Sequence, residues 1–207
     1  ILTNTGVWSP DSEWIVYDTR NDAAGDVFDG TRIEMVNVRT GEVRVLYESQ
    51  NGAHCGVATF HPRVMKVAFI LGPGNPTPDW QYNAWHRQGV IVECSHPGKA
   101  LNLDARDLVP PFTPGALRGG SHVHVWDGAG ECVSFTYEDH VLAQFSLEGR
   151  KRELDVPGVV AVDDLVVGDG DDHRHDLALG QQVVHDQVHA AVVDPVVGQV
   201  AAAAHKV

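Results

Sequence analysis

The sequence predicts an all-β fold: a partial β-propeller of about three four-stranded antiparallel blades, followed by a C-terminal tail outside the propeller. Two observations carry this prediction. A turn-and-strand unit recurs three times in the first three quarters of the chain, and residue usage changes abruptly after it. The expected domains are therefore residues 1–153 for the partial propeller and residues 154–207 for the tail.

The recurring unit starts with an aromatic residue, has Pro or Gly two places on, and continues through a polar turn into a β-rich run. Proline fixes φ and cannot donate to a strand ladder, so it favours the turn. The β-branched and aromatic residues that follow are typical of a strand. The three units are Trp8–Tyr17, Phe60–Phe69 and Trp126–Phe135.

Each unit is followed by residues that predict a second hairpin, and two successive hairpins make the four-stranded sheet of a propeller blade. A two-sheet sandwich fits the same turn spacing and remains the alternative fold. The middle unit also carries an insertion from Gly72 to Gln88. The expected second hairpins are Arg32–Val38 with Glu42–Tyr47, Gly89–Glu93 with Lys99–Leu103, and a third that opens with Val141–Leu147.

The tail uses a restricted set of residues. From Asp155 to Val207 there is no aromatic residue and no Ser, Thr, Asn, Glu or Ile. Every residue type in this stretch except Lys206 has a codon that starts with G or C. That bias is typical of a GC-rich gene translated in the wrong frame. We therefore expect a frameshift product that is disordered or poorly packed, with a genuine low-complexity tail as the alternative.

Charge and hydropathy argue against two classes of partner, nucleic acid and the membrane interior. The net charge of −13 argues against nucleic acid, whose phosphates need a Lys/Arg surface. The apolar runs are too short to span a bilayer. The chain starts at Ile1 without Met, so we expect the true N-terminus to be missing, and a bacterial cytoplasmic or periplasmic location stays open.

Several runs resemble known propellers. Trp8–Tyr17 resembles the repeat of TolB-like propellers, and the runs Arg118–His124 and Ser134–His140 resemble the uncharacterised bacterial YidR-type family of TolB-like proteins. The resemblance covers about residues 1 to 150 and implies a ring of about six blades, so the remaining blades are missing from this chain. It implies a fold more than an activity.

His122 and His124 are the first candidates for chemistry. Residues i and i+2 of a strand face the same way, so two imidazoles on one face can hold one metal ion. His54 precedes the second unit and is expected to supply a third ligand. A divalent ion such as Mn or Zn would suit these ligands, and hydrogen-bonded channel histidines without an ion are the alternative. His86 and His140 are weaker candidates, whereas His61 and His96 are expected to be solvated turn residues.

The insertion is rich in aromatic residues for a loop. Trp80, Tyr82 and Trp85 are expected to form a stacking platform for a sugar or peptide, with Arg87 holding a carboxylate. Packing as a lid over the blade edge is the alternative. Arg118 and Ser121, from the family-like run, complete the expected ligand-binding set.

Two functions are expected from these features. The first is a non-catalytic propeller that binds a small molecule, a sugar or a protein at the mouth of its channel. The second is a metal-dependent lyase or hydrolase acting on acidic oligosaccharides. His122 and His124 look like part of the histidine-held metal site of oligogalacturonate lyases, although Gly119 stands where those enzymes have Gln.

Overall fold

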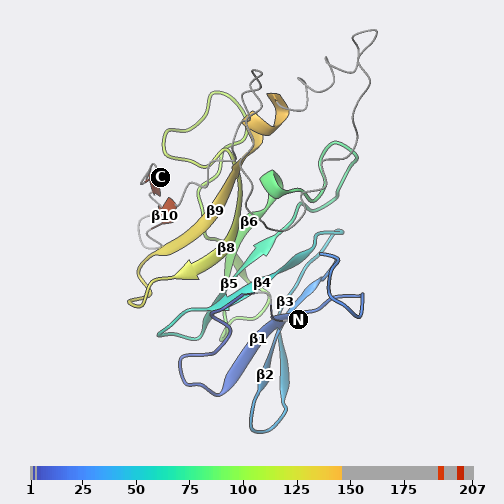
Figure 1. Ribbon diagram of the computed structural model, residues 1–207, viewed down its shortest axis with the longest axis vertical. Helices are drawn as coiled ribbons and strands as arrows, with labels where there is room; N and C mark the ends of the chain where they lie inside the picture. The colour runs from blue at the N-terminus through green and yellow to red at the C-terminus, as the bar shows by residue number, and fades with distance from the viewer. Residues whose placement is uncertain (1, 3, 146–190, 194–199, 203–207) are drawn as a thin grey trace, which may run out of the picture.

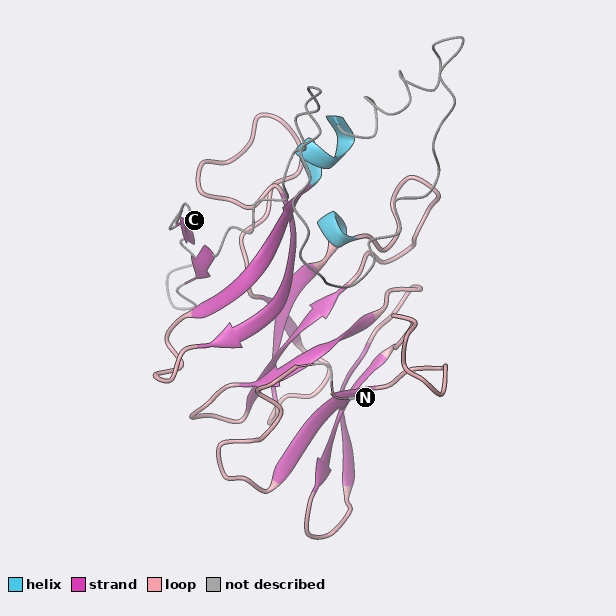
Figure 2. Ribbon diagram, viewed as in Figure 1, coloured by secondary structure: helices cyan, strands magenta, loops and turns pink. Residues whose placement is uncertain are grey.

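The protein is almost entirely β-structure. The computed structural model describes residue 2, residues 4–145 and the short segments 191–193 and 200–202. These residues form three antiparallel sheets that follow one another along the molecule, with β1–β3 at one end and β8–β9 at the other (Figures 1 and 2). Within the described residues, the sheets are open and none closes on itself.

Neighbouring strands in each sheet pair in antiparallel register. The first sheet contains β1 (Trp14–Asp18), β2 (Arg32–Asn37) and β3 (Val43–Glu48). The second contains β4 (Cys55–Phe60), β5 (Lys66–Leu71), β6 (Gln88–Glu93) and β7 (Ala100–Asn102). The third contains β8 (Gly119–Trp126), β9 (Val133–Asp139), β10 (Ala191–Val193) and β11 (Val200–Ala202).

The three predicted turn-and-strand units all form hairpins, closed in the same way. A backbone N–H of the residue after the aromatic donates to the carbonyl five places on. The side chain of the donating residue, which differs in each unit, also accepts backbone N–H groups of its own turn. The closing bonds are Ser9 to Trp14 at 2.9 Å, His61 to Lys66 at 2.8 Å and Asp127 to Cys132 at 3.0 Å.

The first two of the expected second hairpins are confirmed, as β2–β3 and β6–β7. The third is wrong where the structure describes it, because residues 140–145 are helical. Asp139 explains the helix: its Oδ1 accepts the Leu142 N–H at 3.0 Å, which caps the first turn. Leu147 lies outside the described residues.

Two short strands of the tail complete the third sheet. β10 pairs with β9 in antiparallel register, Ala191 opposite Phe135, and β11 pairs with β10. The rest of residues 154–207 lies outside the described part of the chain, so the wrong-frame origin of this segment stays a prediction.

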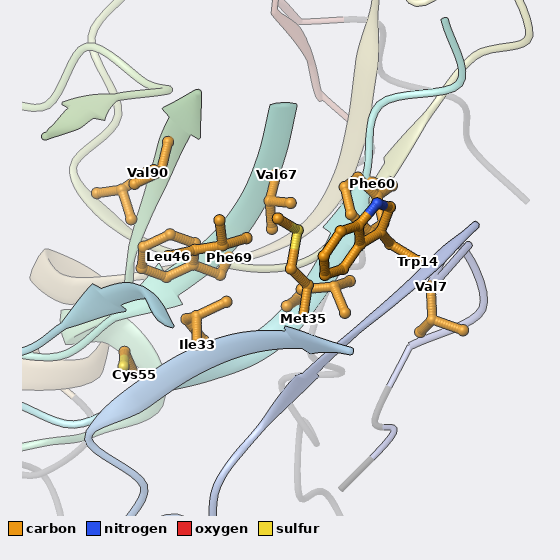
Figure 3. Close-up of a cluster of buried hydrophobic side chains, with 13 residues drawn as sticks. Val7, Trp14, Ile33, Met35, Leu46, Cys55, Phe60, Val67, Phe69 and Val90 are labelled. Carbon is orange, nitrogen blue, oxygen red and sulfur yellow. The ribbon is translucent and has the colours of Figure 1, made fainter. Parts of the chain in front are cut away.

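Strand β5 of the middle sheet is buried on both faces. Val67 and Phe69 of β5 point into a core shared with the first sheet, which Figure 3 shows around Ile33 and Met35. Ala68 points the other way, into a smaller cluster with Val133 of the third sheet. In β1 and β9, by contrast, buried and more exposed residues alternate. The apolar run of β5 is thus the sequence signature of a strand covered on both sides.

Leu46 and Leu101 provide a matched test of this core. Leu46 is 1% exposed, and Leu101, on the outer strand of the next sheet, is 67% exposed. We expect Leu46→Ala to lower the free energy of unfolding by about 2–5 kcal/mol through lost burial and the cavity left behind. Leu101→Ala should stay within about 0.5 kcal/mol of the parent chain. Urea unfolding of both variants measures this, and equal losses would contradict the described core.

Candidate functional site

Four side chains form a continuous stack that links the first and second sheets. The Arg20 guanidinium lies over the Phe28 ring, 4.6 Å from its centroid. Phe28 stacks on Tyr82 at 4.4 Å with an interplanar angle of 19°. Arg87 closes the series, with its Nε donating to the Tyr82 hydroxyl at 3.0 Å. We call Arg20, Phe28, Tyr82 and Arg87 the ladder.

The two arginines of the ladder differ in their charge partners. Arg20 donates to Asp18 Oδ2 at 2.7 Å, and both side chains of this ion pair are almost fully buried. Arg87 is half-buried, and within the described part of the chain it forms no ion pair. Burial raises the pKa of Tyr82 above its usual value, although the charge of Arg87 opposes this shift. Exposed Glu138 adds a smaller raising effect. The ladder therefore ends in a guanidinium that no carboxylate of the described residues pairs with.

The positive charge of Arg87 acts on His122, whereas the ring of its predicted partner, His124, lies against Gly89. β8 contains a bulge, at which His122 faces Thr136 and Val125 faces Ser134. Val123 and His124 therefore share one position opposite β9, and Val123 has φ of 53°. His122 and Val125 share one face as a result, and the prediction that His122 and His124 lie on one face is wrong.

His122 is neutral at physiological pH. Its pKa is lowered to about 4, first by burial and then by the positive charge of Arg87. A neutral imidazole can both donate and accept a hydrogen bond. Beside Arg87, it can add a neutral contact to whatever the guanidinium binds.

His124 belongs instead to a buried polar chain. Its Nε2 lies 3.1 Å from Ser121 Oγ, and the Ser121 hydroxyl donates to Asp104 Oδ2 at 2.8 Å. Ser121 and His124 are fully buried, and Asp104 is 5% exposed. The chain of contacts fastens the loop after β7 to β8. It therefore places Ser121 in the interior rather than on a ligand-facing surface.

The three histidines predicted to hold a metal are not grouped. Among the residues that the structure describes, no three His, Cys, Asp or Glu side chains form a cluster that could hold an ion. His54 Nδ1 is buried without a hydrogen-bond partner, and its carbonyl accepts the Gly72 N–H at 2.8 Å. Metal binding by His54, His122 and His124 stays a prediction.

The aromatic residues of the insertion form two groups. The loop spans residues 72–87, because β6 already begins at Gln88. Tyr82 joins the ladder, whereas Trp80 packs on His86 with ring centroids 3.9 Å apart, and Trp85 contacts the same imidazole edge-on. The single platform expected from Trp80, Tyr82 and Trp85 is therefore divided between Phe28 and His86.

Arg118 is already paired. Its guanidinium donates to Asp139 Oδ2 at 2.6 Å and lies 5.3 Å from the Phe112 ring centroid. Tyr137 donates to the same carboxylate oxygen at 3.2 Å. These contacts give Arg118 a role in holding the loop before β8 against β9.

Two turn histidines were expected to be solvated. His96 is exposed, as expected. His61 is 8% exposed, and its Nε2 bonds the Gly130 carbonyl in the third sheet at 2.9 Å. The prediction for His61 is wrong because the turn of the next sheet covers it.

Sequence reasoning missed Phe28 altogether. Phe28 lies in a polar loop between β1 and β2, far from Tyr82 along the chain. The one available signal was an aromatic residue in a loop otherwise rich in Asp and Gly. His86 and His140 are the weaker metal-ligand candidates by sequence, yet their rings lie 5.0 Å apart.

The buried position of His124 predicts a pH dependence of stability. Its pKa is lowered to about 3 by burial first and then by His122 and Arg106, whereas an unfolded histidine titrates near 6.5. The unfolded chain therefore takes up this proton first. Above about pH 6.5, His124 makes its full contribution to the free energy of unfolding. That contribution falls by about 1.4 kcal/mol per pH unit as the pH drops toward the pKa of the folded state.

Urea unfolding across this pH range measures the effect. His124→Asn should have a shallower loss of stability with falling pH than the parent chain, whatever its absolute stability. His96→Asn, at an exposed position, should keep the parent slope. Equal slopes for His124→Asn and the parent would contradict a neutral, buried His124.

Comparison with known proteins identifies the family. The model of a family described as "Protein of unknown function (DUF3748)" matches residues 54–176. Over 142 residues the chain is 56% identical to "Uncharacterized protein YidR" of Escherichia coli (strain K12). That similarity covers 69% of this chain and 33% of the relative, so the chain spans about a third of the relative's length. The matched segment contains the insertion, β8 and β9. The chain belongs to the DUF3748 family.

Proposed function

We propose that this chain forms part of a TolB-like β-propeller that binds a carboxylate group of a small molecule or protein at Arg87. The observation that carries the ligand proposal is a half-buried guanidinium, held by Tyr82, with no ion pair in the described part of the chain. The propeller itself rests on the sequence resemblance and on the arrangement of the three sheets.

Two repeated features support a propeller. The three hairpins close with the same five-residue hydrogen bond. The first strands of the second and third sheets, β4 and β8, both have a bulge with a valine at positive φ, Val57 at 59° and Val123 at 53°. β4 packs against the first sheet and β8 against the second, as expected of successive blades.

Arginine favours a carboxylate at this position. A guanidinium presents paired N–H donors whose spacing matches the two oxygens of a carboxylate. The Nε of Arg87 donates to Tyr82, and its two terminal nitrogens have no hydrogen-bond partner among the residues that the structure describes, so both can bind a ligand. Leaving such a charge half-buried without a counterion is unfavourable, and an anionic ligand would remove that cost.

The binding reading is preferred to the metal-dependent lyase or hydrolase. That alternative needs at least two histidines on one metal, and the β8 bulge turns His122 and His124 to opposite faces. No feature of the described residues favours a catalytic pair. A binding site at Arg87 requires no rearrangement of the fold.

Succinate and its neutral diamide, succinamide, test the proposal. Binding is followed by NMR titration of the His122 imidazole, on which the charge of Arg87 acts. Succinate should shift the resonance with a saturable dependence on concentration, and succinamide should not. Arg87→Gln should weaken succinate binding by about tenfold or more, because it removes a charged hydrogen-bonding partner. Arg87→Lys should restore only part of the affinity, since ammonium lacks the fork.

Arg39→Gln is the matched control, because the Arg39 side chain is 78% exposed and its Nε lies 4.0 Å from Glu13. It should bind succinate like the parent chain. Equal responses to succinate and succinamide, or an unchanged affinity in Arg87→Gln, would overturn the proposal.

A further inference from the structure

His86 and His140 lie against one another where the insertion meets the third sheet. His86 ends the short 3-10 helix η1 (Ala84–His86), which packs on β8 and β9. A side chain at Gly120 of β8 would collide with the Ala84 carbonyl, so glycine permits this close approach. His86 Nε2 lies 3.2 Å from Nδ1 of His140, which directly follows β9. Trp80 covers both rings, at centroid distances of 3.9 and 5.6 Å.

The hydrogen bonds determine where the protons are. His86 Nδ1 lies 2.7 Å from the Gln81 carbonyl oxygen, which can only accept, so Nδ1 carries the hydrogen. Neutral His86 therefore has its lone pair on Nε2. His140 must then donate to it from Nδ1, and the lone pair of neutral His140 is on Nε2. Both rings are thus Nδ1–H tautomers.

We propose that His86 and His140 form a proton-sensitive latch that holds the insertion against the end of β9 and thereby regulates the carboxylate site. The regulatory part rests on the proposed function, because Arg87 directly follows His86. A first proton from solvent can add to His140 Nε2 without breaking the bond between the rings. A second proton must add to His86 Nε2, where two N–H groups would then face each other and the latch opens.

The surrounding charges set the pH range. Burial is the largest cause that lowers the pKa of both histidines, and Arg106 lowers both further. For His86, the hydrogen bond to the Gln81 carbonyl opposes this shift and the charge of His140 adds to it. Asp139 acts in the opposite direction on His140. Asp139 is itself paired with Arg118, which limits that effect. Glu138, the other acidic residue at this end of β9, is exposed and is not among the groups that shift the pKa of either histidine. The latch is therefore closed at neutral pH, and it opens below the usual histidine range.

Two NMR measurements on the full chain test the latch. Long-range ¹H–¹⁵N spectra should show Nδ1–H tautomers for both histidines at about pH 7.5. Exchange of the His86 amide hydrogen, corrected for its intrinsic rate, should show a loss of protection of about tenfold or more between about pH 7.5 and about pH 4.5. His140→Asn should keep its protection at both pH values, because its side-chain amide can donate to neutral His86 and, after rotating, can accept a hydrogen bond from protonated His86. His140→Phe, which has no donor, should have low protection at both.

His96→Asn is the matched control and should behave like the parent chain. An Nε2–H tautomer at either ring, or a pH-dependent loss in His140→Asn equal to that of the parent, would overturn the latch. Succinate binding at about pH 7.5 separates the two proposals. If Arg87→Gln binds succinate normally, the carboxylate site fails while the exchange result still decides the latch. If His140→Phe, with the latch open, binds succinate like the parent, the regulatory link fails even where the latch stands.

Discussion

The burial of β5 on both faces is the constraint on which the rest of the structure depends. Val67 and Phe69 fix the first sheet, and Ala68 contacts the cluster that fixes the third. Because a strand's side chains alternate between its faces, one six-residue segment holds both neighbours in register. The loops that follow β1 and β5 consequently approach one another, and the ladder forms between them. The candidate site is thus a consequence of how the sheets pack, although its residues contribute little to the core.

The arginines near this site have different roles, according to whether a carboxylate pairs with them. Asp18 neutralises Arg20, and Asp139 neutralises Arg118, so these arginines stabilise loops. Arg87 donates to an uncharged phenol and has no carboxylate partner among the described residues, so its charge is available there. An arginine whose nearest acceptor is a carboxylate therefore has a structural role, whereas one whose nearest acceptor is neutral can bind an anion. Arg87 is of the second kind.

The sequence predicted those structural features that are determined by residues close together in the chain. The aromatic residue, the Pro or Gly and the polar turn predicted each hairpin, because turn geometry is determined within a few residues. Val141 and its neighbours looked like a strand, but the cap supplied by Asp139 favours a helix. The bulge at Val123 gave no signal, since valine rarely adopts positive φ and only the surrounding sheet imposes it. The contact between Phe28 and Tyr82 was also beyond sequence reasoning, because it depends on how two sheets pack. Arg87 was predicted to bind a carboxylate from its residue type, but only the structure shows that no carboxylate of the described residues pairs with it.

The contact between Phe28 and Tyr82 is the most direct test that the stacked sheets bring these two loops together. A double-mutant cycle with Phe28→Leu, Tyr82→Leu and the double variant, measured by urea unfolding, isolates their interaction. Stacked aromatic pairs contribute about 0.5–1.5 kcal/mol beyond burial, and we expect a coupling energy in that range. Strictly additive effects of the two substitutions would show that the loops do not meet, and would contradict this account of the site.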